Sequence, residues 1–112
     1  MVQILIYAYT RKIVISGYLM PPVSEPLRRD VTIMNELGLH ARSAAKLAKL
    51  AQEAVGAVWL QAGPERIDAK QILDILTLAA GQGDRVQIVV EKEADLALLN
   101  RIVALFADGF GE

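Results

Sequence analysis

The chain has 112 residues, of which 54% are hydrophobic, and carries a formal net charge of −1 with no cysteine. This length fits one compact domain with a real core, and the absence of cysteine excludes disulfides, thiolate catalysis and cysteine-based zinc sites. The balanced charge argues against a general nucleic-acid binder, and a lone histidine without clustered acids argues against a transition-metal site.

The first part of the chain is apolar and has strand-like character at residues 2–7 and 13–16. Arg11 and Lys12 divide it, so that neither half approaches the ~20 residues of a membrane-spanning helix. The basic pair also lies too far into the chain for a good secretory signal. We therefore expect a cytoplasmic protein without membrane insertion.

A proline-rich linker follows at residues 21–26. We expect residues 1–27 to be an N-terminal extension and linker, and residues 28–112 to be the functional domain. Met20 stands immediately before the linker, so one hypothesis is that the natural protein starts there. The rival interpretation is an extra strand docked on the sheet edge, and mass spectrometry of the native protein separates the two.

Seven further elements are predicted in the domain from hydrophobic periodicity and turn residues. The first helix has Ala44, Leu47, Ala48, Ala51 and Val55 on one face and a stop signal at Gly56, and the last begins with the acids Glu93 and Asp95. The predicted strands are residues 29–34, 57–61, 66–68 and 84–91, and the predicted helices are residues 41–54, 69–79 and 93–107.

This order is β-α-β-β-α-β-α, an α+β arrangement. Strands and helices with one apolar face each predict an antiparallel or mixed sheet covered on one side by helices. The pattern leaves the strand order open.

His40, the only histidine, lies where a loop turns into the first helix. A helix chosen only for stability would begin with a polar cap followed by an acid, whereas His40 is followed by Ala41 and Arg42. A cation there is unfavourable by about 0.3–1 kcal/mol. The misfit disappears if an anion occupies the helix start, where free N–H groups and a guanidinium can surround a phosphate. His40 is then a candidate phosphoryl acceptor.

The segment Gly38-Leu39-His40-Ala41-Arg42, followed by two small residues, resembles the active-site signature of HPr, the histidine phosphocarrier of the bacterial phosphoenolpyruvate-dependent phosphotransferase system. Ala69-Lys70-Gln71-Ile72-Leu73 resembles the segment that opens the second helix of that family, at the family's distance from His40. Gly81-Gln82-Gly83-Asp84 and the closing amphipathic helix follow in family order. The resemblance covers about residues 28–112.

The resemblance implies an open-faced β-sandwich, with a four-stranded antiparallel sheet covered on one face by three helices. It implies that His40 accepts a phosphoryl group on Nδ1 from enzyme I and passes it to enzyme IIA in sugar uptake. Arg42 and the backbone N–H groups of Ala41 and Arg42 would hold the phosphoryl oxygens. No metal or cofactor is implied, and a monomer is expected. The implied docking residues are Ala45, Lys49, Ile72, Leu73 and Leu76, with Lys46 as a further rim charge.

Two positions depart from the family pattern. Ser43 stands where proline usually follows the arginine, and we interpret it as a helix cap rather than a phosphate ligand. Gln71 stands where many relatives carry a serine that a regulatory kinase phosphorylates, so serine control at this position is absent.

Two alternative functions remain open. The first is a regulatory, nitrogen-type phosphotransferase carrier without sugar transport. The second is a non-catalytic interaction module on the same fold that binds transcriptional or metabolic regulators. The presence of His40 argues against the second, because a binding-only relative could lose it freely.

Overall fold

The computed structural model describes residues 14–15, 18–19 and 27–112. Within the first part, β1 (Val14–Ile15) pairs antiparallel with β2 (Tyr18–Leu19), and β1 lies inside the strand predicted at residues 13–16. The predicted strand at residues 2–7, the linker and the proposed start at Met20 lie outside the described residues. The division into an extension and a domain stays a prediction.

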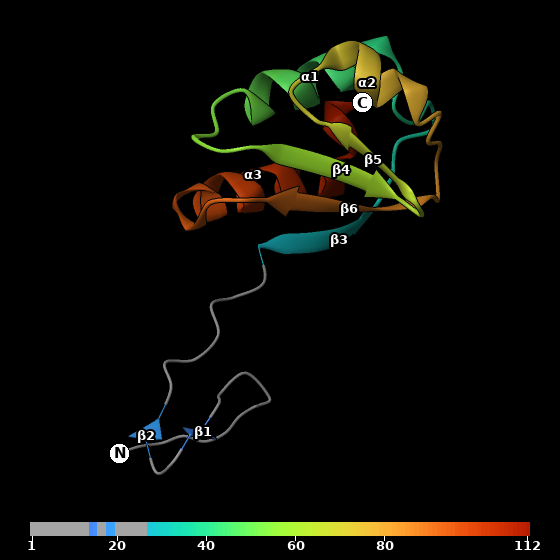
Figure 1. Ribbon diagram of the computed structural model, residues 1–112. Coiled ribbons are helices and arrows are strands. Elements are labelled where there is room, and N and C mark those ends of the chain that lie inside the picture. Colours follow the sequence, from blue (N-terminus) through green and yellow to red (C-terminus); the bar gives the residue numbers. More distant parts are fainter. Residues whose placement is uncertain (1–13, 16–17, 20–26) are drawn as a thin grey trace.

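Four strands form the sheet of the domain, and each is antiparallel to its neighbours. They are β3 (Arg28–Thr32), β4 (Val58–Ala62), β5 (Glu65–Asp68) and β6 (Arg85–Val90). Their order is β3-β6-β4-β5, with β6 and β4 in the centre (Figure 1). The sheet is therefore antiparallel throughout, as the family resemblance implied, and the strand order is now defined.

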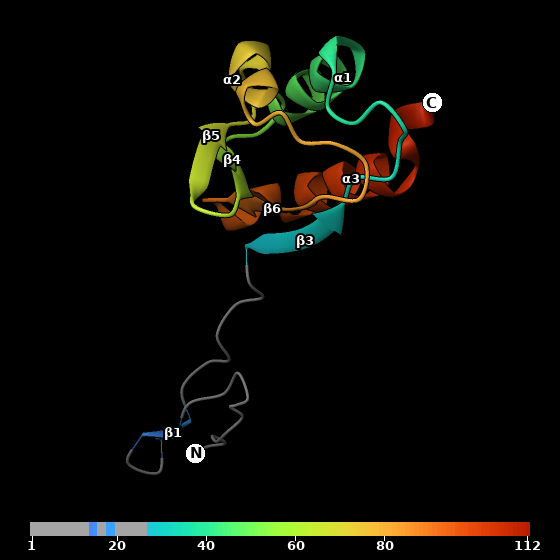
Figure 2. The same cartoon turned by 90° about the vertical axis from the view of Figure 1, so that its right-hand side faces the viewer.

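Three α-helices cover one face of this sheet: α1 (Ala41–Ala51), α2 (Ile72–Thr77) and α3 (Leu96–Ala107). Figure 2 shows α1 and α2 side by side near β4 and β5, with α3 alongside β6 and β3. Short 3₁₀ turns, η1 (Glu93–Asp95) and η2 (Gly109–Gly111), flank α3. The predicted α+β open-faced sandwich is confirmed.

The core lies between the sheet and the helices. In β6 the residues alternate, so that Val86, Ile88 and Val90 point into the core while Arg85 is exposed, as expected for a sheet with one covered face. The covering helices contribute their apolar stripes. The large side chains of this core with no exposed surface are Ile33, Leu47, Val58, Leu60, Ile75, Ile88, Leu99, Ile102, Phe106 and Phe110.

Helix α1 is shorter than predicted: it ends at Ala51 rather than near residue 54. The amide N–H groups of Val55 and Gly56 donate to the two carboxylate oxygens of Asp95, at 2.9 and 2.8 Å. Asp95 is buried and lies far away in the sequence, so a tertiary contact holds the segment that follows the helix. Asp95 thus anchors this segment, whereas the sequence suggested that it complements the dipole of its own helix. Val55 lies beyond the helix and is 74% exposed, contrary to its predicted place on the apolar face.

Helix α2 starts at Ile72, three residues later than predicted. The N–H of Ala69 bonds to the carbonyl oxygen of Val58 at 2.9 Å, and the N–H of Lys70 bonds to the Asp68 carboxylate at 2.8 Å. These bonds hold the backbone of residues 69 and 70 beside the sheet, so the helix begins only where the chain leaves the sheet, at Ile72.

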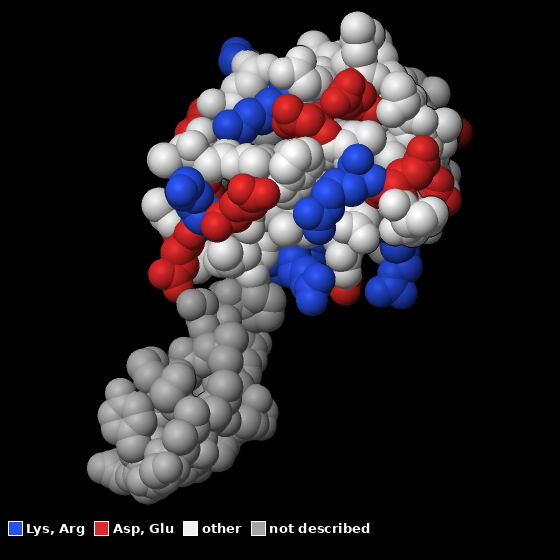
Figure 3. Space-filling model, viewed as in Figure 1, with Lys and Arg blue, Asp and Glu red and all other residues white. Residues whose placement is uncertain are grey.

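The surface charge is mixed. Basic and acidic side chains are interspersed over the domain face in Figure 3, in keeping with the net charge of −1. Among the residues described, no helix is long and apolar enough to cross a membrane.

Candidate functional site

His40 is the N-cap residue of α1, with extended backbone angles of −105° and −176°. The preceding loop is held against the segment before β6, because the N–H of Leu39 bonds to the carbonyl oxygen of Ala80 at 3.0 Å. Gly38 has a φ of +66°, and a Cβ at this position would lie 2.6 Å from that carbonyl oxygen. Glycine is therefore required by both the backbone angle and the close approach.

Ser43 connects the loop to the first turn of α1. Its hydroxyl accepts a hydrogen bond from the N–H of His40 at 3.0 Å and donates one to the carbonyl oxygen of Gly38 at 2.8 Å. The His40 side chain faces the Ser43 backbone N–H in a capping-box arrangement, although too loosely for a side-chain hydrogen bond. Ser43 is fully buried, so its hydroxyl is used inside the loop, in agreement with the capping interpretation.

The predicted phosphate ligands come together at this helix start. Ala41 and Arg42 occupy the first turn of α1, which has no acidic residue. The Arg42 side chain is 63% exposed. The first N–H groups of a helix have no partner within the helix, so two backbone donors and a guanidinium lie next to the His40 ring. Their role in binding a phosphoryl group stays a prediction.

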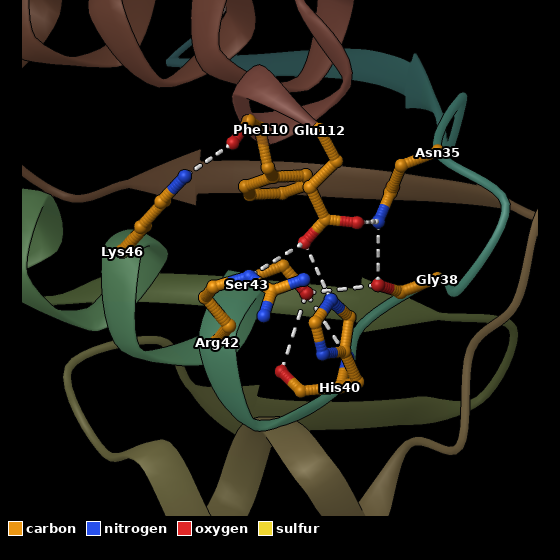
Figure 4. Close-up of polar contacts among 8 residues, drawn as sticks. All are labelled: Asn35, Gly38, His40, Arg42, Ser43, Lys46, Phe110 and Glu112. Atoms are coloured by element: carbon orange, nitrogen blue, oxygen red, sulfur yellow. Dashed lines mark hydrogen bonds and ion pairs between the residues drawn. The ribbon is translucent and has the colours of Figure 1, made fainter.

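The His40 ring also contacts a residue that sequence reasoning missed. Oε2 of Glu112 lies 2.5 Å from Nε2 of His40 and 3.7 Å from Nε of Arg42 (Figure 4). The anion at this helix start in the structure is thus a carboxylate of the chain itself. A separation of 72 positions leaves no local sequence signal for this contact.

Asn35 holds the other oxygen of this carboxylate. Its Nδ2 donates to Glu112 Oε1 at 3.0 Å and to the carbonyl oxygen of Gly38 at 2.8 Å (Figure 4). The hydrogen bond from Asn35 lowers the pKa of Glu112 below its ordinary value of 4.5. The hydrogen bond to His40 and the charges of His40 and Arg42 also lower this pKa, while partial burial of the carboxyl opposes them. Glu112 is therefore ionised at neutral pH.

The backbone after α3 turns back toward α1 and thereby places Glu112 beside His40. Gly109, Phe110 and Gly111 have φ values of +61°, +59° and +73°, which turn the backbone back toward α1. Phe110 is fully buried and packs edge-on against Phe106, with ring centroids 4.8 Å apart. The N–H of Glu112 bonds to the carbonyl oxygen of Gly109 at 3.1 Å. We call residues 109–112 the hook.

The predicted docking residues differ in exposure. Leu73 is 76% exposed and Ile72 and Lys49 are also exposed, whereas Ala45 and Leu76 are half-buried. Lys46 is not a free rim charge, because its Nζ donates to the carbonyl oxygen of Phe110 at 2.6 Å. Their use in docking stays a prediction.

Two more exposed apolar residues, Met34 and Leu37, were not predicted. They line a pocket together with Arg42 and Glu112. Gln71 is the exposed N-cap of α2, and its amide cannot accept a phosphoryl group.

Comparison with known proteins identifies the family. The family described as "PTS HPr component phosphorylation site" matches residues 27–108. The phosphocarrier protein HPr of Cupriavidus necator is 41% identical over 86 residues, covering 77% of this chain and 97% of the relative. The phosphocarrier protein NPr of Shewanella violacea is 38% identical over 86 residues, covering 77% and 94%.

A solved structure agrees with this assignment. That of HPr from Thermoanaerobacter tengcongensis superposes with a TM-score of 0.72 at 29% identity, covering 76% of this chain and 96% of that one. Because a family match over most of the chain and a solved structure point to the same proteins, the chain belongs to the HPr family of phosphocarrier proteins of the bacterial phosphotransferase system.

Proposed function

We propose that this phosphocarrier accepts a phosphoryl group on His40 from phosphorylated enzyme I, ultimately from phosphoenolpyruvate, and passes it to an enzyme IIA domain in sugar uptake. The observation that carries the proposal is the position of His40 at the start of α1, next to Arg42 and two free helix-start donors, in a chain that matches the family's phosphorylation-site description.

The accepting atom is Nδ1 in this proposal. Nε2 of His40 is bonded to the carboxylate of Glu112, which leaves Nδ1 as the ring nitrogen available to attack phosphorus. The N–H groups of Ala41 and Arg42 and the Arg42 guanidinium then offset the negative charge of the phosphoryl oxygens. A carrier needs only moderate stabilisation, because a group held too firmly is not passed on.

Donor and acceptor would dock on the same surface, beside His40. The exposed side chains of Ile72 and Leu73 supply apolar area, and Lys49 supplies a positive charge at the rim. Such a small, partly apolar surface suits partners that must bind and leave in turn.

The nitrogen-type regulatory carrier is the second candidate, and the similarity to NPr of Shewanella violacea supports it. The chemistry at His40 is the same in both, so only the acceptor distinguishes them. Phosphoryl transfer from the loaded protein to sugar-type and nitrogen-type enzyme IIA proteins of the same genome separates the two.

The proposal is tested by incubating the protein with enzyme I and phosphoenolpyruvate. We expect an acid-labile phosphoryl group in the wild-type protein and none in His40→Ala, which should remain folded because a surface cap residue contributes little to the core. Phosphate incorporated into His40→Ala would place the acceptor elsewhere. Wild-type protein that takes no phosphoryl group would favour a non-catalytic interaction module.

A further inference from the structure

The Glu112 carboxylate is held in place as the hydrogen-bond partner of Nε2 of the His40 ring. Three side chains from two other parts of the chain surround it: His40 and Arg42 at the start of α1, and Asn35 in the preceding loop. Its side chain is only 14% exposed. An ionised carboxylate can only accept hydrogen bonds, so Nε2 of His40 carries the proton in this contact.

Asn35 determines the orientation in which the Glu112 carboxylate is held. Both protons of its amide nitrogen are committed, one to Gly38 and one to Glu112 Oε1. Its own oxygen, Oδ1, is buried and has no hydrogen-bond partner among the described residues. Turning the amide over would place Oδ1 against two acceptors, so Nδ2 must face Glu112. Oε1 of Glu112 is therefore held as the partner of Asn35, and Oε2 as the partner of His40.

From this arrangement we propose that Glu112 is a positioning residue for phosphoryl transfer: it holds His40 in the Nε2–H tautomer, leaves the Nδ1 lone pair free, and stabilises the positive charge that the ring acquires. The inference deepens the proposed function and rests on it. The logic is that of a carboxylate that orients a histidine through the ring nitrogen not involved in the reaction.

The transfer step balances with this assignment. The Nδ1 lone pair attacks phosphorus, the bond from phosphorus to the donor breaks, and its electron pair stays with the donor. The new N–P bond leaves the His40 ring with a positive charge and the proton still on Nε2, 2.5 Å from the Glu112 carboxylate. The reverse step, transfer to an acceptor, passes through the same charged ring. Glu112 should therefore assist both directions.

Replacing Glu112 by glutamine gives a specific test, because Asn35 dictates how the new amide lies. The amide nitrogen of Asn35 would donate to the side-chain oxygen of the new glutamine at position 112. The NH₂ group of that glutamine would therefore face Nε2 of His40. An NH₂ group donates, so Nε2 must accept and the ring proton moves to Nδ1, where it blocks the attacking lone pair. Glu112→Ala only removes the partner and leaves both tautomers accessible. The glutamine variant should therefore be worse than the alanine variant.

The experiment measures the His40 tautomer by ¹⁵N NMR of the full chain, and the rate of phosphorylation by enzyme I and phosphoenolpyruvate. We expect mainly Nε2–H in the wild type, mainly Nδ1–H in Glu112→Gln, and a mixture in Glu112→Ala. We expect rates lower by about 10- to 100-fold in Glu112→Gln and by a smaller factor in Glu112→Ala. Glu65→Gln, which removes an exposed carboxylate in β5, is the matched control and should behave like the wild type.

Melting temperatures of all four proteins establish that each is folded. A wild-type rate and an unchanged tautomer in Glu112→Gln would overturn the inference, as would a slower Glu112→Ala than Glu112→Gln. Failure of the proposed function is distinguishable, because it appears as a wild-type protein that takes no phosphoryl group. The tautomer measurement needs no phosphoryl donor, so an unchanged tautomer in Glu112→Gln would overturn the role of Glu112 even then.

Discussion

The ammonium group of Lys46, on α1, lies 2.6 Å from the carbonyl oxygen of Phe110, in the middle of the hook. Helix α1 thus holds both His40, at its start, and the segment that carries Glu112. Lys46 therefore connects the helix that begins at His40 with the hook that carries Glu112, and its charge is not free at the surface.

Lys46→Met should loosen the hook while keeping the aliphatic part of the side chain. Loss of one charge-assisted hydrogen bond at a partly exposed position should cost about 1–2 kcal/mol of unfolding free energy. Urea denaturation measures this loss, and amide hydrogen exchange at Gly111 and Glu112 should become faster. Lys49→Met, which removes an exposed lysine from the same helix, is the control and should change stability little. Equal stabilities of the two variants would mean that the Phe110 contact contributes nothing.

Gly38→Ala should destabilise the domain through two separate effects. The φ of +66° disfavours any Cβ, and that Cβ would lie 2.6 Å from the backbone oxygen of Ala80. We expect a loss of about 2–5 kcal/mol in chemical denaturation. Gly63→Ala is the matched control, since its φ is +58° with no atom within 4 Å of the new Cβ. It should cost only about 1–2 kcal/mol, and equal losses in both variants would show that the close approach to Ala80 is unimportant.

Arg42→Ala should slow phosphorylation by about 10-fold or more, if its guanidinium offsets charge on the phosphoryl oxygens. Its ion pair with Glu112, at 3.7 Å, is long and exposed on the arginine side, so unfolding free energy should change by less than about 1 kcal/mol. Stopped-flow transfer from enzyme I and thermal denaturation measure the two quantities. A larger loss of stability with unchanged kinetics would assign Arg42 to structure.

Leu73→Glu should weaken binding to enzyme I and to enzyme IIA together, because we place both partners on the α2 surface. Stability should change little, since the side chain is 76% exposed. Val55→Glu introduces the same charge at an apolar side chain that is 74% exposed beyond the far end of α1, and should leave both affinities unchanged. Calorimetric titration checks these values. Loss of binding to one partner alone would show that the two recognition surfaces differ.

The contacts of the Glu112 carboxylate should stabilise the fold fully at pH values above about 4.5 and less at lower pH. The pKa of Glu112 is lowered in the folded protein from its ordinary value of 4.5. The unfolded chain therefore binds the proton first, and stability is lost as pH falls below that value. The melting temperature of the wild type should exceed that of Glu112→Gln by a constant amount at neutral pH, and the difference should shrink below about pH 4.5. A difference that is independent of pH would mean that the ionised carboxylate does not stabilise the fold.

Element types were predicted well and their ends were not. The periodicity of residues 41–54 predicted a helix correctly, but the helix ends at Ala51, and the segment after it is held by bonds from Val55 and Gly56 to Asp95. Similarly, the bond from Ala69 to Val58 holds a turn beside the sheet, and α2 begins only at Ile72. Beside both boundaries the backbone is held by partners that are distant in the sequence, so a local pattern does not reveal where the helices end or begin.

The α+β class, the family and the candidate acceptor could be predicted from the sequence, because apolar periodicity and the motif around His40 are local. The strand order and the environment of the His40 ring became known from the structure, since both depend on contacts between distant segments. Glu112 reaches this ring, and Asn35 reaches Glu112, because β3 and α3 pack side by side, which brings the loop after one and the hook after the other to the start of α1. Such contacts arise from the packing of whole elements, and a hydrogen bond across 72 positions leaves no trace in the spacing of residues.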